Sequence, residues 1–400
     1  MTFHDFQFEP ALMEGLDAMG FEKPTPIQEQ AIPIILSNKD LIACAQTGTG
    51  KTAAFLLPVI NDIIKSHTHA INTLIIVPTR ELAVQIDEAL QGFSYFTPVS
   101  SMAIYGGTGG TAFEQEKRAL KHGANIIIAT PGRLIAHLNM GYVQFNHLRH
   151  LILDEADRML DMGFHDDIMK ILTYLPQKRQ TLMFSATMPP QIRALAKKIL
   201  HHPAEINIAL SKPTSGIMQG AYVVYNSQKI DLLKSLLQGK KIASILIFAS
   251  TKEKVKELGR ELHKFGFNVA AIHSDLEQAQ RSEVLRLFKN KQLQILVATD
   301  VLSRGIDIDS IGLVINYDVP GDAEDYIHRV GRTARAESTG IALTFISPED
   351  QHKFKRIEAL IGSHVRKLHL PGHVGTAPEY NPEQRQSRVR KQSLKTSRKK

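Results

Sequence analysis

The chain of 400 residues contains no tryptophan and only one cysteine, Cys44. A single cysteine excludes an internal disulfide and any zinc or iron–sulfur site built from several cysteines, as expected in a reducing compartment. No apolar run approaches the roughly 18 residues that span a bilayer, and the first ten residues lack the basic and apolar regions of a signal peptide. We therefore expect a cytoplasmic protein that does not use a membrane.

Nearly all of the net positive charge of the chain lies at its C-terminal end. The formal net charge is +8, from 48 Lys or Arg and 40 Asp or Glu. Residues 381–400 hold eight basic residues and one acidic residue, so their net charge is +7 and the preceding 380 residues carry +1. Because a basic run with few apolar residues cannot build a core, residues 366–400 are predicted to be a disordered tail attracted to phosphate backbones. A tail that only improves solubility is the alternative.

Short apolar runs recur between helical stretches and form two series. Their continuous apolar character predicts strands buried on both faces, and the alternation with helices predicts parallel, doubly wound α/β sheets. The first series lies at 41–45, 73–79, 101–107, 125–130, 151–157 and 181–187, and the second at 244–250, 268–274, 294–300, 313–319 and 341–347. Pro213 and Gly216 interrupt the pattern. We therefore expect one domain at 1–206, a linker at 207–217 and a second domain at 218–365.

A glycine-rich loop, AQTGTGKT (45–52), follows the first apolar run and precedes a helical stretch. Its glycines permit the tight turn that aims backbone amides at phosphates, its lysine can reach the β- and γ-phosphates, and its last hydroxyl suits Mg²⁺. Only Ala45, in place of the first glycine, departs from the usual P-loop pattern. The residues expected to hold ATP here are Gln46, Thr47, Gly48, Thr49, Gly50, Lys51 and Thr52. An ordinary glycine-rich turn is the alternative.

The run at 151–157 ends in the segment DEAD, whose three acidic residues are Asp154, Glu155 and Asp157. The carboxyl edge of an open α/β sheet is where ligands bind, so these carboxylates are expected beside the phosphate loop. Asp154 can hold Mg²⁺ through water, and Glu155 can polarise the water that attacks the γ-phosphate. A helix N-cap is the alternative for so short an acidic run.

Further motifs extend this pattern: PTREL (78–82), TPGR (130–133), SAT (185–187) and HRVGRTAR (328–335) occur in that order around the sequence DEAD. The ordered set resembles the DEAD-box family of ATP-dependent RNA helicases over about residues 3–350. The resemblance implies two RecA-like domains, with ATP and RNA bound across the cleft between them. The compact layout, without long insertions, is similar to bacterial helicases of the RhlE type.

The resemblance assigns further residues to the nucleotide. Gln28, in the segment GFEKPTPIQ, would read the adenine edge, since an amide offers a donor and an acceptor together. Phe3 and Phe21 would be aromatic neighbours of the base, although both also suit a hydrophobic core. Asp307 would contact the ribose.

The resemblance also assigns residues that couple ATP to domain closure. The hydroxyls of Ser185 and Thr187 would bond Asp157, the last acid of DEAD. His328 and Arg329 would complete the coupling from the second domain.

Two arginines of HRVGRTAR, Arg332 and Arg335, resemble the family's arginine fingers, which neutralise charge developing on the γ-phosphate. The family usually has glycine at the position of Ala334, so the turn before Arg335 departs mildly from the pattern. Surface ion pairing is the alternative for each arginine taken alone.

By the same resemblance, RNA would be held through its backbone, without sequence preference. Aromatic residues make up only 6% of the chain, so recognition by base stacking is not indicated. The expected contacts are Pro78, Thr79, Arg80, Gly106, Gly107, Thr130, Gly132 and Arg133 in the first domain, and Ser250, Gln278, Arg281, Thr299 and Asp300 in the second.

These residues together predict an RNA-dependent ATPase that uses ATP and Mg²⁺ and separates short RNA duplexes locally, or remodels RNA–protein complexes. An ATP-gated RNA clamp that serves as an assembly platform and hardly unwinds is the first alternative, and a DNA helicase is the second. Proteins of ribosome assembly or RNA decay are possible partners in either role.

Overall fold

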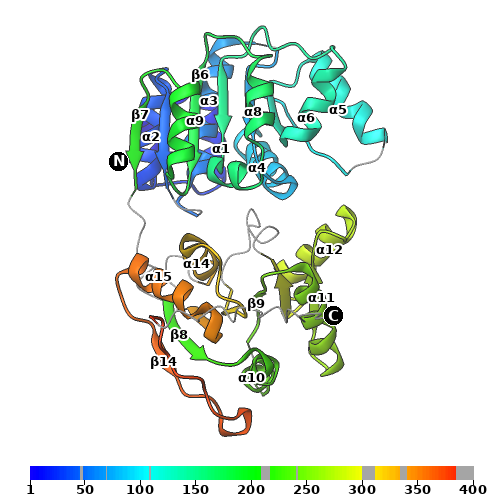
Figure 1. Ribbon diagram of the computed structural model, residues 1–400. Coiled ribbons are helices and arrows are strands. Elements are labelled where there is room, and N and C mark those ends of the chain that lie inside the picture. The colour runs from blue at the N-terminus through cyan, green and yellow to red at the C-terminus, as the bar shows by residue number, and fades with distance from the viewer. Residues whose placement is uncertain are drawn as a thin grey trace, which may run out of the picture. The chain divides into compact units, whose positions relative to one another are not determined.

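The computed structural model describes residues 1–45, 48–68, 70–107, 110–208, 217–239, 242–299, 311–333 and 340–383. The described chain forms two compact units, one mainly from residues 1–208 and the other mainly from residues 217–383 (Figure 1). Within these ranges no helix is both long enough and apolar enough to cross a membrane.

The first unit is built around a seven-stranded parallel sheet with the strand order β3-β4-β2-β5-β6-β1-β7. Its strands are β1 (Leu41–Cys44), β2 (Thr73–Ile76), β3 (Ser101–Ile104), β4 (Ile126–Ala129), β5 (His150–Leu153), β6 (Gln180–Ser185) and β7 (Ala204–Asn207). Its helices are α1 (Pro10–Ala18), α2 (Pro26–Leu36), α3 (Lys51–Ser66), α4 (Arg80–Phe93), α5 (Gly110–His122), α6 (Pro131–Asn139), α7 (Ala156–Asp161), α8 (His165–Leu172) and α9 (Pro190–Ile199).

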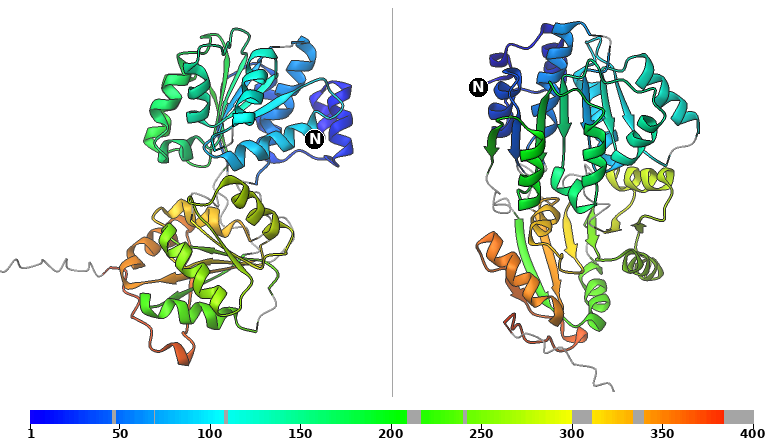
Figure 2. Two further views of the ribbon diagram at one scale, coloured as in Figure 1. Left: turned by 90° about the vertical axis from the view of Figure 1, so that its right-hand side faces the viewer. Right: turned by 45° about the horizontal axis from the view of Figure 1, so that its top comes forward.

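Both faces of this sheet are covered by helices (Figure 2). Alternate residues of a strand point to opposite faces. In β2, Ile75 therefore packs with α1, α2, α3 and α4, whereas Leu74 and Ile76 pack with the layer that contains α6, α7, α8 and α9. This two-sided burial explains why the strands are continuously apolar in the sequence.

The second unit repeats the same plan, with a parallel sheet of order β10-β11-β9-β12-β13-β8-β14. Its strands are β8 (Ile217–Val223), β9 (Ile245–Phe248), β10 (Val269–Ile272), β11 (Ile295–Ala298), β12 (Leu313–Asn316), β13 (Gly340–Ile346) and β14 (Arg366–Leu368). Its helices are α10 (Lys229–Leu237), α11 (Lys252–Lys264), α12 (Gln278–Lys289), α14 (Ala323–Val330) and α15 (Gln351–Ile361). The fold expected from the sequence, two mostly parallel doubly wound α/β domains, is confirmed.

Residues 366–383 differ from the expected disordered tail. Strand β14 pairs in parallel with β8. Tyr380 then donates a hydrogen bond of 3.0 Å to the buried carboxylate of Glu358, which also accepts one of 2.6 Å from Lys367. Specific hydrogen bonds therefore hold this segment, together with the apolar contacts of Leu368, Leu370 and Val374 with the core of the second unit. The basic remainder, 384–400, lies outside the described residues, as does most of the expected linker, whose bounds stay a prediction.

Candidate functional site

The phosphate loop connects β1 to α3, as the motif predicts. Gly48 and Gly50 have φ angles of 83° and 91°, in the left-handed region that only glycine adopts without strain. Gly50 is also the N-cap of α3, and a Cβ added there would lie 2.5 Å from Nε2 of Gln28. Glycine is therefore required at this position for both its backbone angle and its close packing. Gln46 and Thr47 lie outside the described residues.

Lys51 is the first residue of α3, and its side chain is buried. Its Nζ donates a hydrogen bond of 2.8 Å to the carbonyl oxygen of Ala45, at the start of the same loop. The lysine therefore lies folded across the loop that would hold the phosphates. A phosphate group in the loop would offer this amine a charged acceptor in place of a neutral carbonyl. Thr52 follows on the same helical turn and is half-buried.

Gln28 lies in the first turn of α2, and its amide joins that helix to the phosphate loop. Its Oε1 accepts a hydrogen bond of 2.8 Å from the amide of Thr25, and its Nε2 donates one of 3.1 Å to the carbonyl of Gly50. The Thr25 hydroxyl adds a bond of 2.7 Å to the carbonyl of Thr49. A primary amide has two N–H groups and two lone pairs, so Gln28 keeps one donor and one acceptor position for a nucleobase.

The two aromatic candidates near this site belong to the hydrophobic core. Phe3 is 1% exposed and packs edge-on against Phe21, with ring centroids 5.8 Å apart. Phe21 also contacts Phe93 at 5.2 Å. This arrangement matches the core interpretation that the sequence left open, and their contact with a base stays a prediction.

The DEAD residues lie at the carboxyl end of β5, between the ends of its neighbours β2 and β6. Asp154 is 3% exposed, and its Oδ1 accepts a hydrogen bond of 2.9 Å from the amide of Glu155. Burial raises the pKa of Asp154, and the positive charge of Lys51 opposes that shift. Glu155 is buried and has a φ of 52°. A left-handed non-glycine residue of this kind is strained, and such strain is concentrated at functional sites.

Asp157 joins the DEAD segment to the SAT segment after β6. Its Oδ2 accepts hydrogen bonds of 3.0 Å from both the amide and the hydroxyl of Thr187. The hydroxyl of Ser185 accepts a bond of 3.2 Å from the amide of Asp157. The structure thus brings together the three residues that the resemblance paired, while their role in coupling stays a prediction.

The first-unit RNA candidates lie along the same edge of the sheet. Thr79 caps α4 and accepts a hydrogen bond of 3.3 Å from the amide of Leu82, and Pro78 is buried just before it. The guanidinium of Arg80 packs against Gly106 and Gly107, where a Cβ on Gly107 would lie 2.7 Å from its Cζ. The two glycines therefore leave the room that Arg80 occupies.

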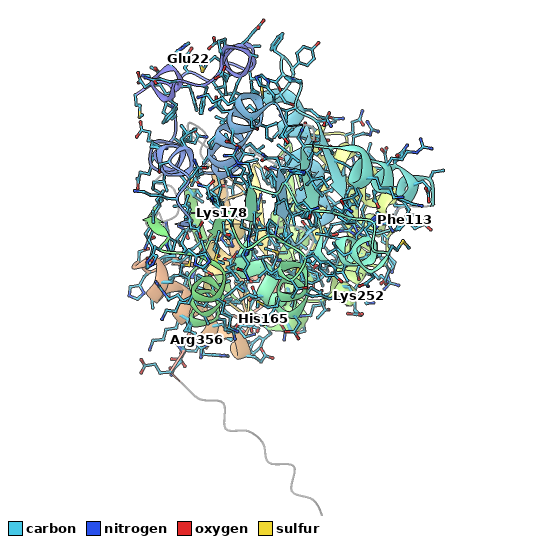
Figure 3. All side chains as sticks on the ribbon, turned by 90° about the horizontal axis from the view of Figure 1, so that it is seen from above. Glu22, Phe113, His165, Lys178, Lys252 and Arg356 are labelled. Atoms are coloured by element: carbon cyan, nitrogen blue, oxygen red, sulfur yellow. The ribbon has the colours of Figure 1, made fainter. Side chains whose placement is uncertain are left out.

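Arg133, in the TPGR segment that opens α6, is held by residues that the sequence analysis missed. Its Nε donates a hydrogen bond of 2.7 Å to Oε2 of Glu116, and its guanidinium lies 4.6 Å from the ring centroid of Phe113, which Figure 3 labels. Glu116 is buried and also bonds His137 at 2.8 Å. Glu116 and His137 belong to no recognised motif, although His137 follows Arg133 by four residues and so shares its face of α6. Thr130 is the N-cap of α6, and Gly132 is exposed in its first turn.

In the second unit, Ser250 follows β9, and Thr299 follows β11. The amide and the hydroxyl of Ser250 both donate hydrogen bonds to Oδ2 of Asp318, at 2.9 and 2.8 Å. Arg281 lies on α12 and is half-buried. The side chain of Gln278 and the residues Asp300, Asp307 and Arg335 lie outside what the structure describes.

Helix α14 carries the first three residues of HRVGRTAR, and the rest of its described part follows the helix. His328 is half-buried, and Arg332 follows the end of the helix, its amide bonded to the carbonyl of Arg329 at 3.2 Å. Arg329 is 3% exposed and points inward: Nη1 donates to Asn316 at 3.1 Å and to the carbonyl of Asp318 at 2.9 Å. The guanidinium lies 4.9 Å from the ring centroid of Phe248. Arg329 is thus a buried residue that joins α14 to the segment 316–318 by hydrogen bonds.

Two family models match the chain: the DEAD/DEAH box helicase model over residues 25–195 and the helicase conserved C-terminal domain over residues 228–337. ATP-dependent RNA helicase CshA of Listeria monocytogenes is 43% identical over 370 residues, which are 92% of this chain and 70% of that protein. DEAD-box ATP-dependent RNA helicase CshA of Bacillus subtilis is 43% identical over 90% of this chain and 72% of its own length.

Solved structures agree over nearly the whole described chain. Dbp5 of S. cerevisiae bound to RNA and ADP BeF3 matches with a TM-score of 0.83 at 30% identity, covering 92% of this chain and 95% of that one. Mss116p bound to ssRNA and AMP-PNP matches with a TM-score of 0.83 at 27% identity, covering 94% and 81%. With the phosphate loop, the DEAD segment and the SAT segment at one sheet edge, these matches show that the chain belongs to the DEAD-box family of ATP-dependent RNA helicases.

Proposed function

We propose that this protein hydrolyses ATP in response to RNA and uses the cycle to separate short RNA duplexes locally or to remodel RNA–protein complexes. The observation that carries the proposal is the convergence of Lys51, Asp154 and Glu155 with the Asp157–Thr187 pair at one edge of the first sheet. Phosphoryl transfer needs positioned charge rather than covalent chemistry, and this edge supplies it.

Nucleotide would be held by the phosphate loop, with Gln28 at the adenine edge. Lys51 would exchange its bond to Ala45 for the β- and γ-phosphates, and Glu155 would orient and polarise the attacking water. Arg332, with Arg335 beside it in the sequence, would stabilise the charge that develops on the γ-phosphate.

The oxygen donors of Thr52 and Asp154 fit Mg²⁺. Among the described residues no cluster of three or more His, Cys, Asp or Glu is placed to hold a metal ion. One carboxylate and one hydroxyl, completed by phosphate oxygens and water, are the usual way in which proteins hold Mg²⁺ with a nucleotide. Bound there, Mg²⁺ would neutralise phosphate charge.

RNA would lie on the backbone-binding residues of both units, from Thr79, Arg80 and Gly107 to Ser250 and Thr299. The solved structures of Dbp5 and Mss116p, which contain RNA, support this assignment. Because the phosphate loop is in the first unit and the arginines are in the second, hydrolysis would need both. ATP and RNA should then strengthen each other's binding, as thermodynamic linkage requires.

Within the family, the relatives reported above carry the name CshA, so the comparisons do not support the RhlE-type placement expected from the compact layout. We therefore propose a CshA-like helicase. Its cytoplasmic location and its protein partners stay predictions.

The deciding experiment measures ATP hydrolysis with no nucleic acid, with single-stranded RNA and with single-stranded DNA at one salt concentration, beside Lys51→Ala. Stimulation by RNA and loss in the variant would support the proposal, whereas equal stimulation by DNA would contradict the RNA assignment. A strand-displacement assay then separates unwinding from clamping, since a clamp would bind RNA with a nonhydrolysable ATP analogue and leave a short duplex intact.

A further inference from the structure

Asp318 lies two residues beyond β12, at the carboxyl edge of the second sheet, and it is 4% exposed. It belongs to none of the motifs that identified the family. We propose that Asp318 is a positioning residue that fixes Ser250 and Arg329 relative to each other, so that RNA binding and ATP hydrolysis respond together. This inference rests on the proposed function and adds a residue to it.

The side chain of Asp318 holds the end of β9. Its Oδ2 accepts the amide of Ser250 at 2.9 Å and the hydroxyl of Ser250 at 2.8 Å. Because the Ser250 hydroxyl donates its hydrogen bond to Asp318, it can act only as an acceptor toward any other group. Asp318 thereby sets the rotamer of Ser250 and the chemistry that it can offer to an RNA hydroxyl.

Two lysines supply the positive charge that a buried carboxylate needs. Lys229, the first residue of α10, is 1% exposed and lies 3.0 Å from Oδ1. Lys254, in the first turn of α11, lies 3.0 Å from both carboxylate oxygens. Burial alone would raise the pKa of Asp318, but the charge of Lys229 and the hydrogen bonds from Ser250 and both lysines hold it well below its usual range. Asp318 is therefore ionised throughout the working pH range.

The backbone next to Asp318 holds Arg329. Nη1 of Arg329 donates to the Asp318 carbonyl at 2.9 Å and to Oδ1 of Asn316 at 3.1 Å. Asn316 in turn donates to the hydroxyl of Thr344 at 3.0 Å, which fixes its orientation. One short segment, 316–318, thus binds the RNA-contact candidate through a carboxylate and the helix of HRVGRTAR through a carbonyl. A shift of this segment would move both.

The first test is Asp318→Asn, which keeps the shape of the side chain and removes its charge. Loss of the charge-assisted bonds should raise the RNA concentration that gives half-maximal ATPase stimulation by about tenfold. Affinity for a fluorescent ATP analogue without RNA should stay unchanged, because the phosphate loop lies in the other unit. If a folded Asp318→Asn variant needs the same RNA concentration as the wild type for half-maximal ATPase stimulation, the proposal is overturned.

A second variant separates positioning from simple stability. Asp318→Asn leaves the buried Lys229 without its counter-charge, so the protein should melt at a lower temperature. The double variant Asp318→Asn with Lys229→Met removes both charges and should recover much of that melting temperature. If Asp318 positions Ser250, the RNA half-stimulation value stays raised in the double variant. Recovery of both properties together would show a structural role and overturn the proposal.

A third variant tests the proposal even if every replacement of Asp318 unfolds the protein. Lys254 is 43% exposed, so Lys254→Met removes one partner of Asp318 and leaves the buried pair intact. It should raise the RNA half-stimulation value by about threefold, the effect of a weak charged hydrogen bond. A wild-type value in this variant would also overturn the proposal.

Asp275 provides a matched control. It too is bound by two lysines of α11, Lys252 at 3.1 Å and Lys256, but its side chain is 42% exposed (Figure 3 labels Lys252). Exposed pairs contribute little, so Asp275→Asn should leave melting and RNA coupling near wild type. If the wild-type protein itself shows no RNA-stimulated ATPase, the proposed function fails, and this inference fails with it. If the wild type is stimulated and the Asp318 and Lys254 variants match it, only this inference fails.

Discussion

The carboxyl ends of β5 and β12 occupy the same place in the two sheets, each being the fourth strand in its order. After β5 the amide of Asp154 bonds the carbonyl of Ile76, and after β12 the amide of Tyr317 bonds the carbonyl of Phe248 in the same way. Glu155 and Asp318, one residue further along, are therefore topological counterparts. One scaffold position thus carries a buried carboxylate in both units.

The carboxyl ends of β5 and β12 also differ in the charges around their buried aspartates, Asp154 and Asp318. In the first unit burial raises the pKa of Asp154, and Lys51 only partly opposes the shift. In the second unit two lysines hold the pKa of Asp318 far below its usual range. The first edge would therefore suit a ligand that brings its own positive charge, as we propose for Mg²⁺, whereas at the second edge two lysines of the protein already neutralise the carboxylate. If the proposed roles are right, two sheets with the same strand order differ in function through the placement of a few lysines.

The largest expected effect comes from the second unit. Arg332→Ala should lower RNA-stimulated ATP hydrolysis by about 10³-fold or more, the usual contribution of an arginine that stabilises phosphoryl transfer. Affinity for a nonhydrolysable ATP analogue should change little. Single-turnover hydrolysis measures the effect, and a loss under tenfold would remove Arg332 from the catalytic set.

Glu155→Gln should lower hydrolysis by about 10² to 10⁴-fold, the range of general base catalysis. ATP and RNA binding should persist, because glutamine keeps the shape of the side chain. Steady-state ATPase and RNA binding with ATP provide the measurements. Hydrolysis at the wild-type rate would show that Glu155 does not act on the attacking water.

Opposite stability changes would confirm the contrast between the two edges. Asp318→Asn should lower the free energy of unfolding by about 3 to 5 kcal/mol, because it leaves Lys229 buried and unpaired. Asp154→Asn should raise it by about 1 kcal/mol in nucleotide-free protein, since it removes a carboxylate that burial disfavours. Urea unfolding followed by circular dichroism compares them, and changes of the same sign would refute the contrast.

The pH dependence of the same variants sharpens the comparison. Because the folded-state pKa of Asp154 is raised, acidification through that pKa protonates it and adds stability, so the advantage of Asp154→Asn should shrink as pH falls. The folded-state pKa of Asp318 is lowered, so its contribution is complete above its unfolded value of 3.8 and is lost only at more acidic pH. Unfolding curves between about pH 2 and pH 7, a range that extends below 3.8, test both trends.

The smallest expected effect concerns the adenine edge. Gln28→Ala should raise the KM for ATP by about tenfold through loss of a buried amide's hydrogen bonds. The change should be smaller for a triphosphate with another base, because only adenine offers the matching edge. Equal changes for both nucleotides would place the whole effect in the phosphate loop.

Much of this architecture was predictable, because buried parallel strands are continuously apolar. Every apolar run that the sequence analysis singled out contains a strand, whereas the strands β7, β8 and β14 were missed. These three lie toward one side of their sheets and contain polar residues, such as Gln219 and Glu205, that weaken the apolar signal.

Some residues of the candidate site were also predictable from the sequence, and others were not. The phosphate loop and the DEAD segment were predictable because their residues are adjacent in sequence. Glu116 and Asp318 were not, since each is a single acid whose partners come from distant segments. Lys229 and Asp318, for example, are separated by 89 positions. Only folding brings such groups together.

The amide of Gln28 has a consequence for how this enzyme can change over time. The same group closes the first turn of α2 and touches the backbone of the phosphate loop at Gly50. A substitution that relaxed the choice of base would therefore also disturb the loop that grips the phosphates. Under the proposed role of Gln28, the choice of base and the hold on the phosphates cannot change independently, because one side chain serves both.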